Sequence, residues 1–439
     1  MIVVPLSEDA RNFYGELLSW GASDQNTLLF PEVEELPFER IISDPENEHQ
    51  RLSALQKLNQ SDSQTLVITS AAALLQKTIA TEKFDSHQLK IQINQNIEIN
   101  KIVNLCVAMG YSVEPSVISP GTISVRGGIV DIFPVGCDEP VRIDFWDNQI
   151  ESIRLFNPID QRSIKSIKSV SIIPAREMLV DQKGLLKLKN FAIDANFANC
   201  NEDVKQKYSQ EIDQLYANNQ FDESNFYSGF FNSGTLMDYF PENGLIIEIE
   251  PSQIATACKE LDQRVHQQKL LKQSRGDTPL RFPSFYFQSK KIVDSIDRFQ
   301  RLNIVAEDEG FTDFADDIVL EQEASNFLEN HIPINPPPVF LGEMGSFIEE
   351  INERIALQFK VVILTAYPQR VREVLQENNI DLETFINFDQ DQSNGGVSVL
   401  KAEYGSISSG FILNNQTERM ILLTDLEIFG VTKKLRQIK

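Results

Sequence analysis

Short apolar runs alternate with helically spaced apolar residues through the first part of the chain. The runs are rich in β-branched residues and have the length of strands, and the stretches between them repeat apolar side chains every three or four positions. The predicted strands and helices lie, in chain order, at residues 2–6, 8–20, 27–30, 50–58, 65–69 and 71–76. Such alternation is typical of a parallel α/β sheet.

The pattern then changes to alternation with a period of two, which indicates half-buried strands. It is clearest at residues 91–97, 122–126 and 141–146. Asp147-Asn148 lies between two such runs, as a two-residue hairpin turn does. We therefore predict a small antiparallel-rich α+β domain, inserted at residues 88–174 into the α/β domain.

Helix and strand patterns return after residue 174. Helical spacing or strand-like runs are found at residues 179–215, 245–249, 252–272, 347–356, 361–365, 369–376, 397–400 and 420–424. Between the two groups, residues 303–330 hold nine acidic side chains and no Lys or Arg, and four prolines follow closely. This composition predicts a linker.

The expected fold class is α/β, with one parallel domain interrupted by the inserted domain and a separate small α/β domain after it. The predicted boundaries are 1–87 and 175–302 for the two parts of domain 1, 88–174 for domain 2, 303–338 for the acidic and Pro-rich linker, 339–432 for domain 3 and 433–439 for a basic tail.

Charge narrows the classes of partner. The 439 residues include 64 acidic and 40 basic side chains, a net charge of −24, which disfavours phosphate backbones and anionic membranes. The inserted domain is nearly neutral, with eight Lys or Arg and nine Asp or Glu. No run of 18 apolar residues is present, so no membrane contact is expected.

The chain lacks the usual motifs of catalysis and cofactor binding. GxxxxGK[ST], GxGxxG, GxSxG and HExxH are all absent. The four cysteines and four histidines are scattered, which predicts no metal site and a reduced, cytoplasmic protein. Gly127-Gly128 is better explained by a tight strand irregularity, with a positive φ or close packing, than by a phosphate-binding turn. We expect no catalytic residue and no cofactor.

Residues 119–176 contain the most specific motifs, namely SVRGGIVDIFP, PVRIDFWDNQIESIRLF, NPIDQRS and IIPARE. This stretch resembles the inserted second domain of the UvrB-like module in the transcription-repair coupling factor (Mfd) family. Collinear motifs extend the resemblance over essentially the whole chain: FPE with LPFER, RLSAL, LMDYFP and LTDLEIFG. The resemblance implies that domain 1 is helicase-like. Genuine UvrB is a poor fit because its helicase motifs and DNA-clamping hairpin are missing.

The chain departs from the family pattern at both ends. Family members begin with a unit holding a degenerate P-loop, and an RNA polymerase-binding domain and an ATP-dependent double-stranded DNA translocase follow their third domain. The sequence resembles an N-terminal part without these units. The resemblance therefore implies no enzyme activity for this chain, and contact with RNA polymerase and double-stranded DNA only through domains absent from it.

In this family the second domain docks onto the repair protein UvrA. The resemblance implies that Arg126, Arg142 and Trp146 form the UvrA interface, with Trp where most relatives carry Phe. Alternation places Arg126 on the strand face opposite Ile123 and Val125, and it places Arg142, Asp144 and Trp146 on one face. Two arginines beside an aromatic side chain have the composition of an interaction hot spot. The same surface is expected to meet a C-terminal domain in a full-length protein.

An ordinary surface remains the alternative for these residues, with Arg142 paired to Asp144 or Glu151 and Trp146 packed on a neighbour. The function that the resemblance implies is recruitment of UvrA to stalled RNA polymerase in transcription-coupled nucleotide excision repair. A nucleotide- or DNA-handling helicase-like fragment and a passive autoinhibitory scaffold are the alternatives. The sequence indicates no ligand for domain 3.

Overall fold

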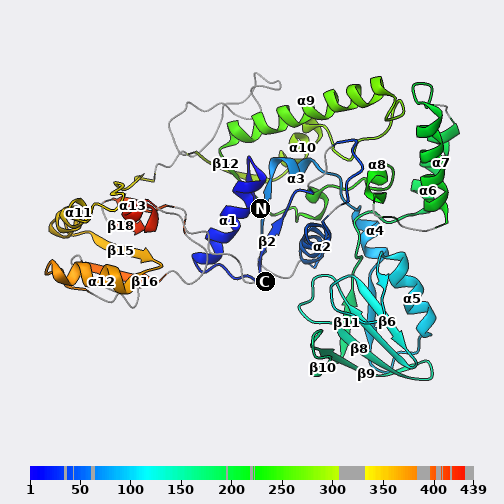
Figure 1. The fold of residues 1–439 in the computed structure, drawn as a ribbon, viewed down its shortest axis with the longest axis horizontal. Helices are drawn as coiled ribbons and strands as arrows, with labels where there is room; N and C mark the ends of the chain where they lie inside the picture. The colour runs from blue at the N-terminus through cyan, green and yellow to red at the C-terminus, as the bar shows by residue number, and fades with distance from the viewer. Residues whose placement is uncertain are drawn as a thin grey trace. The chain divides into compact units, whose positions relative to one another are not determined.

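The computed structural model describes residues 1–33, 37–42, 44–60, 65–193, 196–217, 221, 223–305, 332–382, 396–401, 407, 409–415 and 418–430. Two compact units make up the fold (Figure 1). The first combines Met1–Arg11 with Gln25–Leu320, and the second combines Asn12–Asp24 with Glu321–Lys439. Each unit is described by itself.

A five-stranded, fully parallel sheet forms one part of the first unit. Its order is β13-β12-β1-β3-β2, with β1 at Ile2–Val4, β2 at Thr27–Phe30, β3 at Leu66–Ser70, β12 at Leu245–Ile249 and β13 at Gln300–Ile304. The predicted parallel α/β sheet is confirmed. Strand β13 was not predicted, because Gln-Arg-Leu-Asn-Ile alternates between exposed and half-buried positions at the sheet edge.

The helices of the first unit that accompany this sheet are α2 at Pro45–Asn59, α3 at Ala71–Leu75, α4 at Thr81–Ser86, α9 at Pro251–Arg275 and α10 at Ser289–Ile296. Helices were predicted at residues 50–58, 71–76 and 252–272, where α2, α3 and α9 lie, whereas α4 and α10 were not predicted. Helix α1 (Ser7–Ser19), predicted at residues 8–20, is divided between the two units. Asp44 caps α2 by accepting a hydrogen bond from the backbone N–H of Glu46, and Pro45 occupies the first helical position. Gly276, with φ 77°, ends α9 in the left-handed conformation that favours glycine.

The helical stretch predicted at 179–215 is two helices rather than one. Helix α6 spans Gln182–Ile193 and α7 spans Glu202–Tyr216, and Asn201 caps α7 by accepting from the N–H of Val204. With η1 (Ser224–Tyr227), α8 (Ser228–Phe231) and η2 (Leu236–Tyr239), this region buries many aromatic rings. Its own core includes Phe191, Tyr208, Phe226, Tyr227, Phe230 and Phe282.

A six-stranded sheet is formed by residues that come, in the sequence, after β3 and before β12 of the parallel sheet (Figure 1). Its order is β10-β9-β8-β7-β6-β5, with β5 at Ser112–Val113, β6 at Thr122–Arg126, β7 at Ile129–Phe133, β8 at Val141–Trp146, β9 at Gln149–Phe156 and β10 at Ser163–Ile167. All its pairings are antiparallel except that of β5 with β6. The antiparallel-rich nature of this region is confirmed.

Helix α5 and a separate two-stranded sheet complete this region. Strand β4 (Leu89–Gln92) pairs antiparallel with β11 (Ser169–Ile172). The chain therefore enters the inserted region and leaves it at neighbouring positions. The period-two pattern predicted at 91–97 therefore describes a strand only as far as Gln92. Helix α5 (Ile99–Ala108) follows, and it buries Ile102 and Cys106.

The second unit contains a mixed sheet with helices. Its order is β14-β17-β18-β15-β16, with β14 at Ile334–Asn335, β15 at Lys360–Thr365, β16 at Gly396–Lys401, β17 at Phe411–Asn414 and β18 at Arg419–Thr424. Helices α11 (Met344–Ala356), α12 (Pro368–Glu377) and α13 (Asp425–Phe429) belong to it. The short antiparallel strands β14 and β17 were not predicted.

Most of the predicted acidic linker and the whole basic tail lie outside the described residues. Asn303 and Ile304, which the linker prediction included, belong to β13. Across the ranges that the structure describes, the helices are too short or too polar to cross a membrane.

Candidate protein-interaction surface

Two tight hairpin turns lie at the same end of the strands of the six-stranded sheet, because successive antiparallel strands reverse direction. Asp147-Asn148 joins β8 to β9, as predicted. Gly127-Gly128, predicted as a strand irregularity, is the turn that joins β6 to β7. Gly127 has φ 61° and Asp147 has φ 55°. The Gly128 carbonyl accepts a hydrogen bond of 2.8 Å from the Phe145 N–H, which ties the two hairpins together.

Arg126 and Arg142 meet on the carboxylate of Asp131. The Arg142 Nε and Nη2 atoms donate to the two oxygens of Asp131 at 2.7 and 2.8 Å, and Arg126 Nη2 donates to Oδ2 at 2.5 Å. Asp131 is only 1% exposed. The cross-strand register creates this contact, because Asp131 on β7 lies directly opposite Arg142 on β8. Such a bidentate, charge-assisted pair is strong and directional.

The Arg142 side chain is held on several sides. Its guanidinium lies 4.5 Å from the centroid of the Phe156 ring, and Nη2 also donates to Gln161 Oε1 at 3.1 Å. The hydrogen bonds to Asp131 raise the pKa of Arg142 above its ordinary value. The side chain is 16% exposed, whereas that of Arg126 is 50% exposed. Arg126 therefore offers more of its guanidinium to a partner.

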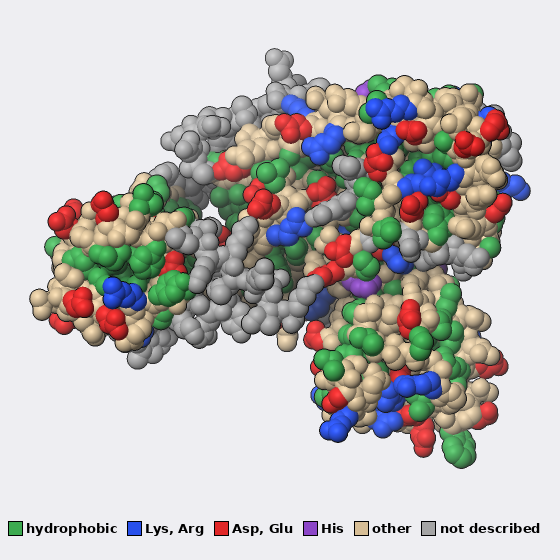
Figure 2. Space-filling model, in the orientation of Figure 1, with side chains coloured by type: hydrophobic (Ala, Val, Ile, Leu, Met, Phe, Trp, Pro, Cys, Tyr) green, Lys and Arg blue, Asp and Glu red, His purple; other side chains and the backbone are tan. Residues whose placement is uncertain are grey.

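Trp146 is 76% exposed at the end of β8, next to the Asp147-Asn148 turn. Its backbone is separated from β6 by β7, so it lies about 10 Å from the strand of Arg126. Figure 2 shows Lys and Arg side chains gathered on the lower part of this sheet, with apolar side chains among them. We call Arg126, Asp131, Arg142 and Trp146 the hairpin surface.

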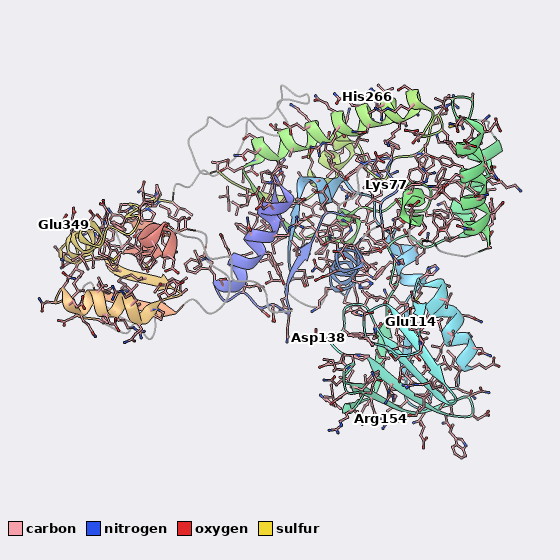
Figure 3. All side chains as sticks on the ribbon, in the orientation of Figure 1. Lys77, Glu114, Asp138, Arg154, His266 and Glu349 are labelled. Atoms are coloured by element: carbon pink, nitrogen blue, oxygen red, sulfur yellow. The ribbon has the colours of Figure 1, made fainter. Side chains whose placement is uncertain are left out.

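The two contacts that the ordinary-surface alternative predicted are not those of the structure. Arg142 pairs with Asp131 rather than with Asp144 or Glu151. The Asp144 carboxylate instead accepts from Arg154 Nη2 at 2.6 Å and from the Ser152 hydroxyl. Trp146 is exposed rather than packed on a neighbour. Arg154 is labelled in Figure 3, on the same sheet.

Sequence reasoning missed Asp131. Its signal is an acidic residue in the middle of the apolar run Ile-Val-Asp-Ile-Phe, where a charge is costly unless it is paired. The sequence alone does not give its partner, since that depends on how β7 and β8 are aligned.

The groups that could carry chemistry elsewhere are buried or isolated. Burial raises the pKa values of the Cys106 and Cys258 thiols to about 12, so neither favours the thiolate. Within the described ranges, no three His, Cys, Asp or Glu side chains come together as a metal site would require. A cavity of about 790 Å³ in the first unit is lined by Glu82, Asp238 and Glu242, with Arg298 at its wall.

Comparison with known proteins first defines the class of domain. Residues 89–178 match the family described as the UvrB interaction domain. This match covers the six-stranded sheet, both hairpins and the β4–β11 pair.

The same comparison extends to whole proteins. A transcription-repair-coupling factor of Bacillus subtilis is 32% identical over 246 residues, which is 53% of this chain and 20% of that protein. Those of Staphylococcus epidermidis and Staphylococcus aureus are each 24% identical, over 426 and 438 residues, and cover 94% of this chain and 34% and 35% of their own lengths.

The chain is therefore similar to transcription-repair-coupling factors along nearly its whole length, and the resemblance drawn from its motifs is confirmed. It spans between a fifth and about a third of the length of these relatives.

Proposed function

We propose that this chain serves transcription-coupled nucleotide excision repair by recruiting UvrA through protein–protein contact at the hairpin surface. The match to the UvrB interaction domain and the names of the relatives support this role. The observation that carries it is the arginine pair fixed on a buried Asp131, in the same sheet as an exposed indole.

The chemistry of the hairpin surface suits a protein partner. Arginines whose guanidinium planes are already fixed lose little entropy when a partner carboxylate or carbonyl binds to them. An exposed indole supplies a large apolar contact with few rotatable bonds. The near-neutral charge of residues 88–174 avoids the repulsion that the whole-chain charge would impose.

A nucleotide-handling role is disfavoured by the polar cavity in the first unit. Three carboxylates and one arginine line that cavity, so the phosphates of a nucleotide would meet mainly like charge. Passive scaffolding offers no reason for an exposed Trp146 in the same sheet as a preformed arginine pair. An adaptor function uses both features.

The direct test is binding of the purified chain to purified UvrA, with wild type compared with single variants. We expect Arg126→Ala and Trp146→Ala each to weaken binding by about 30-fold, the effect of losing a hot-spot side chain. Trp146 is 76% exposed, so unfolding does not explain a loss there. Arg126→Ala also removes a hydrogen bond to the buried Asp131, so urea denaturation of that variant separates a loss of stability from a loss of contact. Trp146→Phe should retain most of the affinity because the aromatic contact persists.

Arg162→Ala is the matched control, because Arg162 is an exposed arginine after the turn that follows β9, away from the two hairpins. It should bind like wild type. Equal affinity of all variants would place the UvrA contact elsewhere. Equal losses in the control and test variants would indicate a non-specific charge effect.

A further inference from the structure

The strand register of the six-stranded sheet places a row of side chains on one of its faces. Side chains of directly opposite residues project from the same face of a sheet, so the partner of each residue extends the row. From β6 to β10 the row consists of Ser124, Asp131, Arg142, Arg154 and Ser166. We call this side of the sheet the arginine face, and Figure 3 labels Arg154 on it.

A small apolar cluster lies on the arginine face. Phe133 and Phe156 each follow a member of the row by two positions, so their rings project from the same face. Together with Val117 they form a cluster whose exposed fractions are 6%, 0% and 0%. The Arg142 guanidinium lies 4.5 Å from the centroid of the Phe156 ring. The charged row and the apolar cluster are therefore in direct contact.

The loop that leads into β6 is held against the arginine face. Val117 anchors it in the apolar cluster, and the Ser124 hydroxyl donates to the Pro115 carbonyl at 3.0 Å. Ile118 comes directly after this anchor and is nevertheless 65% exposed. The loop thus presents an apolar side chain to solvent from a backbone that is fixed on both sides.

The turn after β9 presents a second isoleucine. The Asn157 side chain accepts from the N–H groups of Ile159 and Asp160 at 2.8 and 3.2 Å, and its carbonyl accepts from the Gln161 N–H at 2.9 Å. The Gln161 side chain in turn accepts from Arg142 Nη2 at 3.1 Å. Ile159 is 89% exposed, the largest exposed fraction of any large apolar side chain in the described part of the chain. The turn is therefore fixed internally and tied to the row, while its isoleucine projects outwards.

Single exposed apolar side chains are common on protein surfaces and by themselves indicate no partner. The two isoleucines differ because their loops are held against Phe156 and Arg142, which contact each other. Loops that are already ordered lose little conformational entropy when a partner binds. Their exposed side chains therefore offer apolar contact at a low entropic cost.

The size of a protein interface extends the contact beyond the hairpin surface. A specific interface covers about 800 Å² of each partner, which is roughly 30 Å across. Trp146 lies four residues along β8 from Arg142, a distance of about 13 Å at the usual rise of a strand. A partner of ordinary size that reaches Trp146 therefore also passes over the other end of β8. The loops of Ile118 and Ile159 lie at that end, next to Phe156.

We propose that Ile118 and Ile159 are two further apolar contacts of the surface that binds UvrA, so that Arg142 lies near the centre of the interface. This inference rests on the proposed function and specifies the extent of the same site. Side chains that dominate binding cluster near the centre of an interface, where water is excluded. The complementary partner surface has carboxylates opposite the arginines, with apolar contacts for Trp146 on one side and for the isoleucines on the other.

The test measures the affinity of the full chain for purified UvrA. Ile118→Ser and Ile159→Ser should each weaken binding by about tenfold, because each removes apolar surface that the partner buries. Ile42→Ser is the matched control, since Ile42 is 63% exposed but lies outside residues 89–178. It should bind like wild type. All three side chains are mostly exposed, and urea denaturation should show the same stability for all three variants.

The salt dependence of binding gives a second readout. Arg126→Ala should reduce the dependence of affinity on salt, because it removes a screened charge from the interface. The isoleucine variants should lose the same factor at low and high salt and keep the wild-type slope. Arg162 remains a suitable control, because the next residue, Ser163, pairs with Phe156 on the arginine face and Arg162 therefore points to the other face.

The outcomes separate this inference from the proposed function. If Arg126→Ala and Trp146→Ala weaken UvrA binding while both isoleucine variants bind like Ile42→Ser, the extended contact is wrong and the proposed function stands. If none of these variants changes the affinity, both are wrong. A dimer of the chain alone in sedimentation, dissociated by Ile159→Ser with UvrA binding unchanged, would identify a second copy as the occupant and overturn the inference.

Discussion

Asp131 is the residue on which both arginines of the hairpin surface depend. It is too deeply buried to touch a partner itself, but its two oxygens fix the guanidinium groups of Arg126 and Arg142. Asp131 therefore acts by positioning the two arginines. This effect can be measured separately from the direct contact that the arginines make with a partner.

Replacing Asp131 with Asn tests this role. The amide keeps the shape and one acceptor but loses the charge, which leaves Arg142 partly buried without its counter-charge. We expect a loss of about 1–3 kcal/mol in the free energy of unfolding, measured by urea denaturation. UvrA binding should fall as well. Asp144→Asn is the control, because that carboxylate serves Arg154 instead. A stability loss with unchanged UvrA binding would show that orientation of the arginines is unimportant.

At these residues the sequence predicts faces but not contacts. Alternation correctly separated buried Ile143 from Arg142, because side chains on a strand point to opposite sides. The partner of Arg142 depends on strand register, which no local pattern specifies. A register irregularity between Asp144 and Phe145 also interrupts the regular pairing just before Trp146.

Among the elements, the β6–β7 hairpin depends on two glycines for different reasons. Gly127 adopts φ 61°, and a Cβ there would meet nothing within 4 Å. A Cβ on Gly128 would lie 3.2 Å from the Phe145 carbonyl oxygen. Backbone conformation therefore constrains the first glycine, and close approach of the neighbouring hairpin constrains the second.

This difference gives a prediction for the hairpin. Gly127→Ala should lower the free energy of unfolding by about 1–2 kcal/mol, the cost of a left-handed conformation for a residue with a Cβ. Gly127→Asn should cost less, because Asn tolerates that conformation. Urea denaturation of the two variants measures the difference. An equal effect of Ala and Asn would contradict a purely conformational cause.

Element prediction succeeded where burial produces a strong pattern. The apolar runs of β2 and β3 are mostly buried, that of β12 alternates between buried and more exposed positions, and all three strands were predicted within one residue at each end. Strands β13 and β17 were missed because they are partly exposed and include polar residues. Helix α5 was missed because the alternation before it, at Ile91 and Ile93, was extended too far.

On the scale of the whole molecule, side chains of α2, a helix beside the parallel sheet, contact Arg176 and Glu177, which follow the six-stranded region in the sequence. Glu48 accepts from the Glu177 N–H at 2.6 Å and from Arg176 Nη1 at 3.3 Å. His49, next along α2, lies against Gly121, where its Nε2 would be 3.3 Å from an added Cβ. Burial and the charge of Arg176 lower the pKa of His49 to about 4.

The lowered pKa of His49 predicts a pH-dependent stability of the first unit. The unfolded chain, with an ordinary pKa of 6.5, binds a proton on His49 before the folded chain does. The contribution of His49 to the free energy of unfolding is therefore fully present above pH 6.5 and is lost as the pH drops towards 4. We expect His49 to contribute about 2 kcal/mol to this loss, allowing for partial exposure. Parallel stability–pH curves for wild type and His49→Gln would contradict this assignment.

The central strand β1 pairs with β3 on one side and with β12 on the other, although Ile2 and its partner Ile247 are separated by most of the first unit's sequence. During synthesis, the chain emerges from the ribosome with its N-terminal part first. The six-stranded region is complete once β11 pairs with β4, well before β12 is made. All residues of the six-stranded region therefore leave the ribosome before those of β12, so the parallel sheet can be completed only after that region has been synthesised.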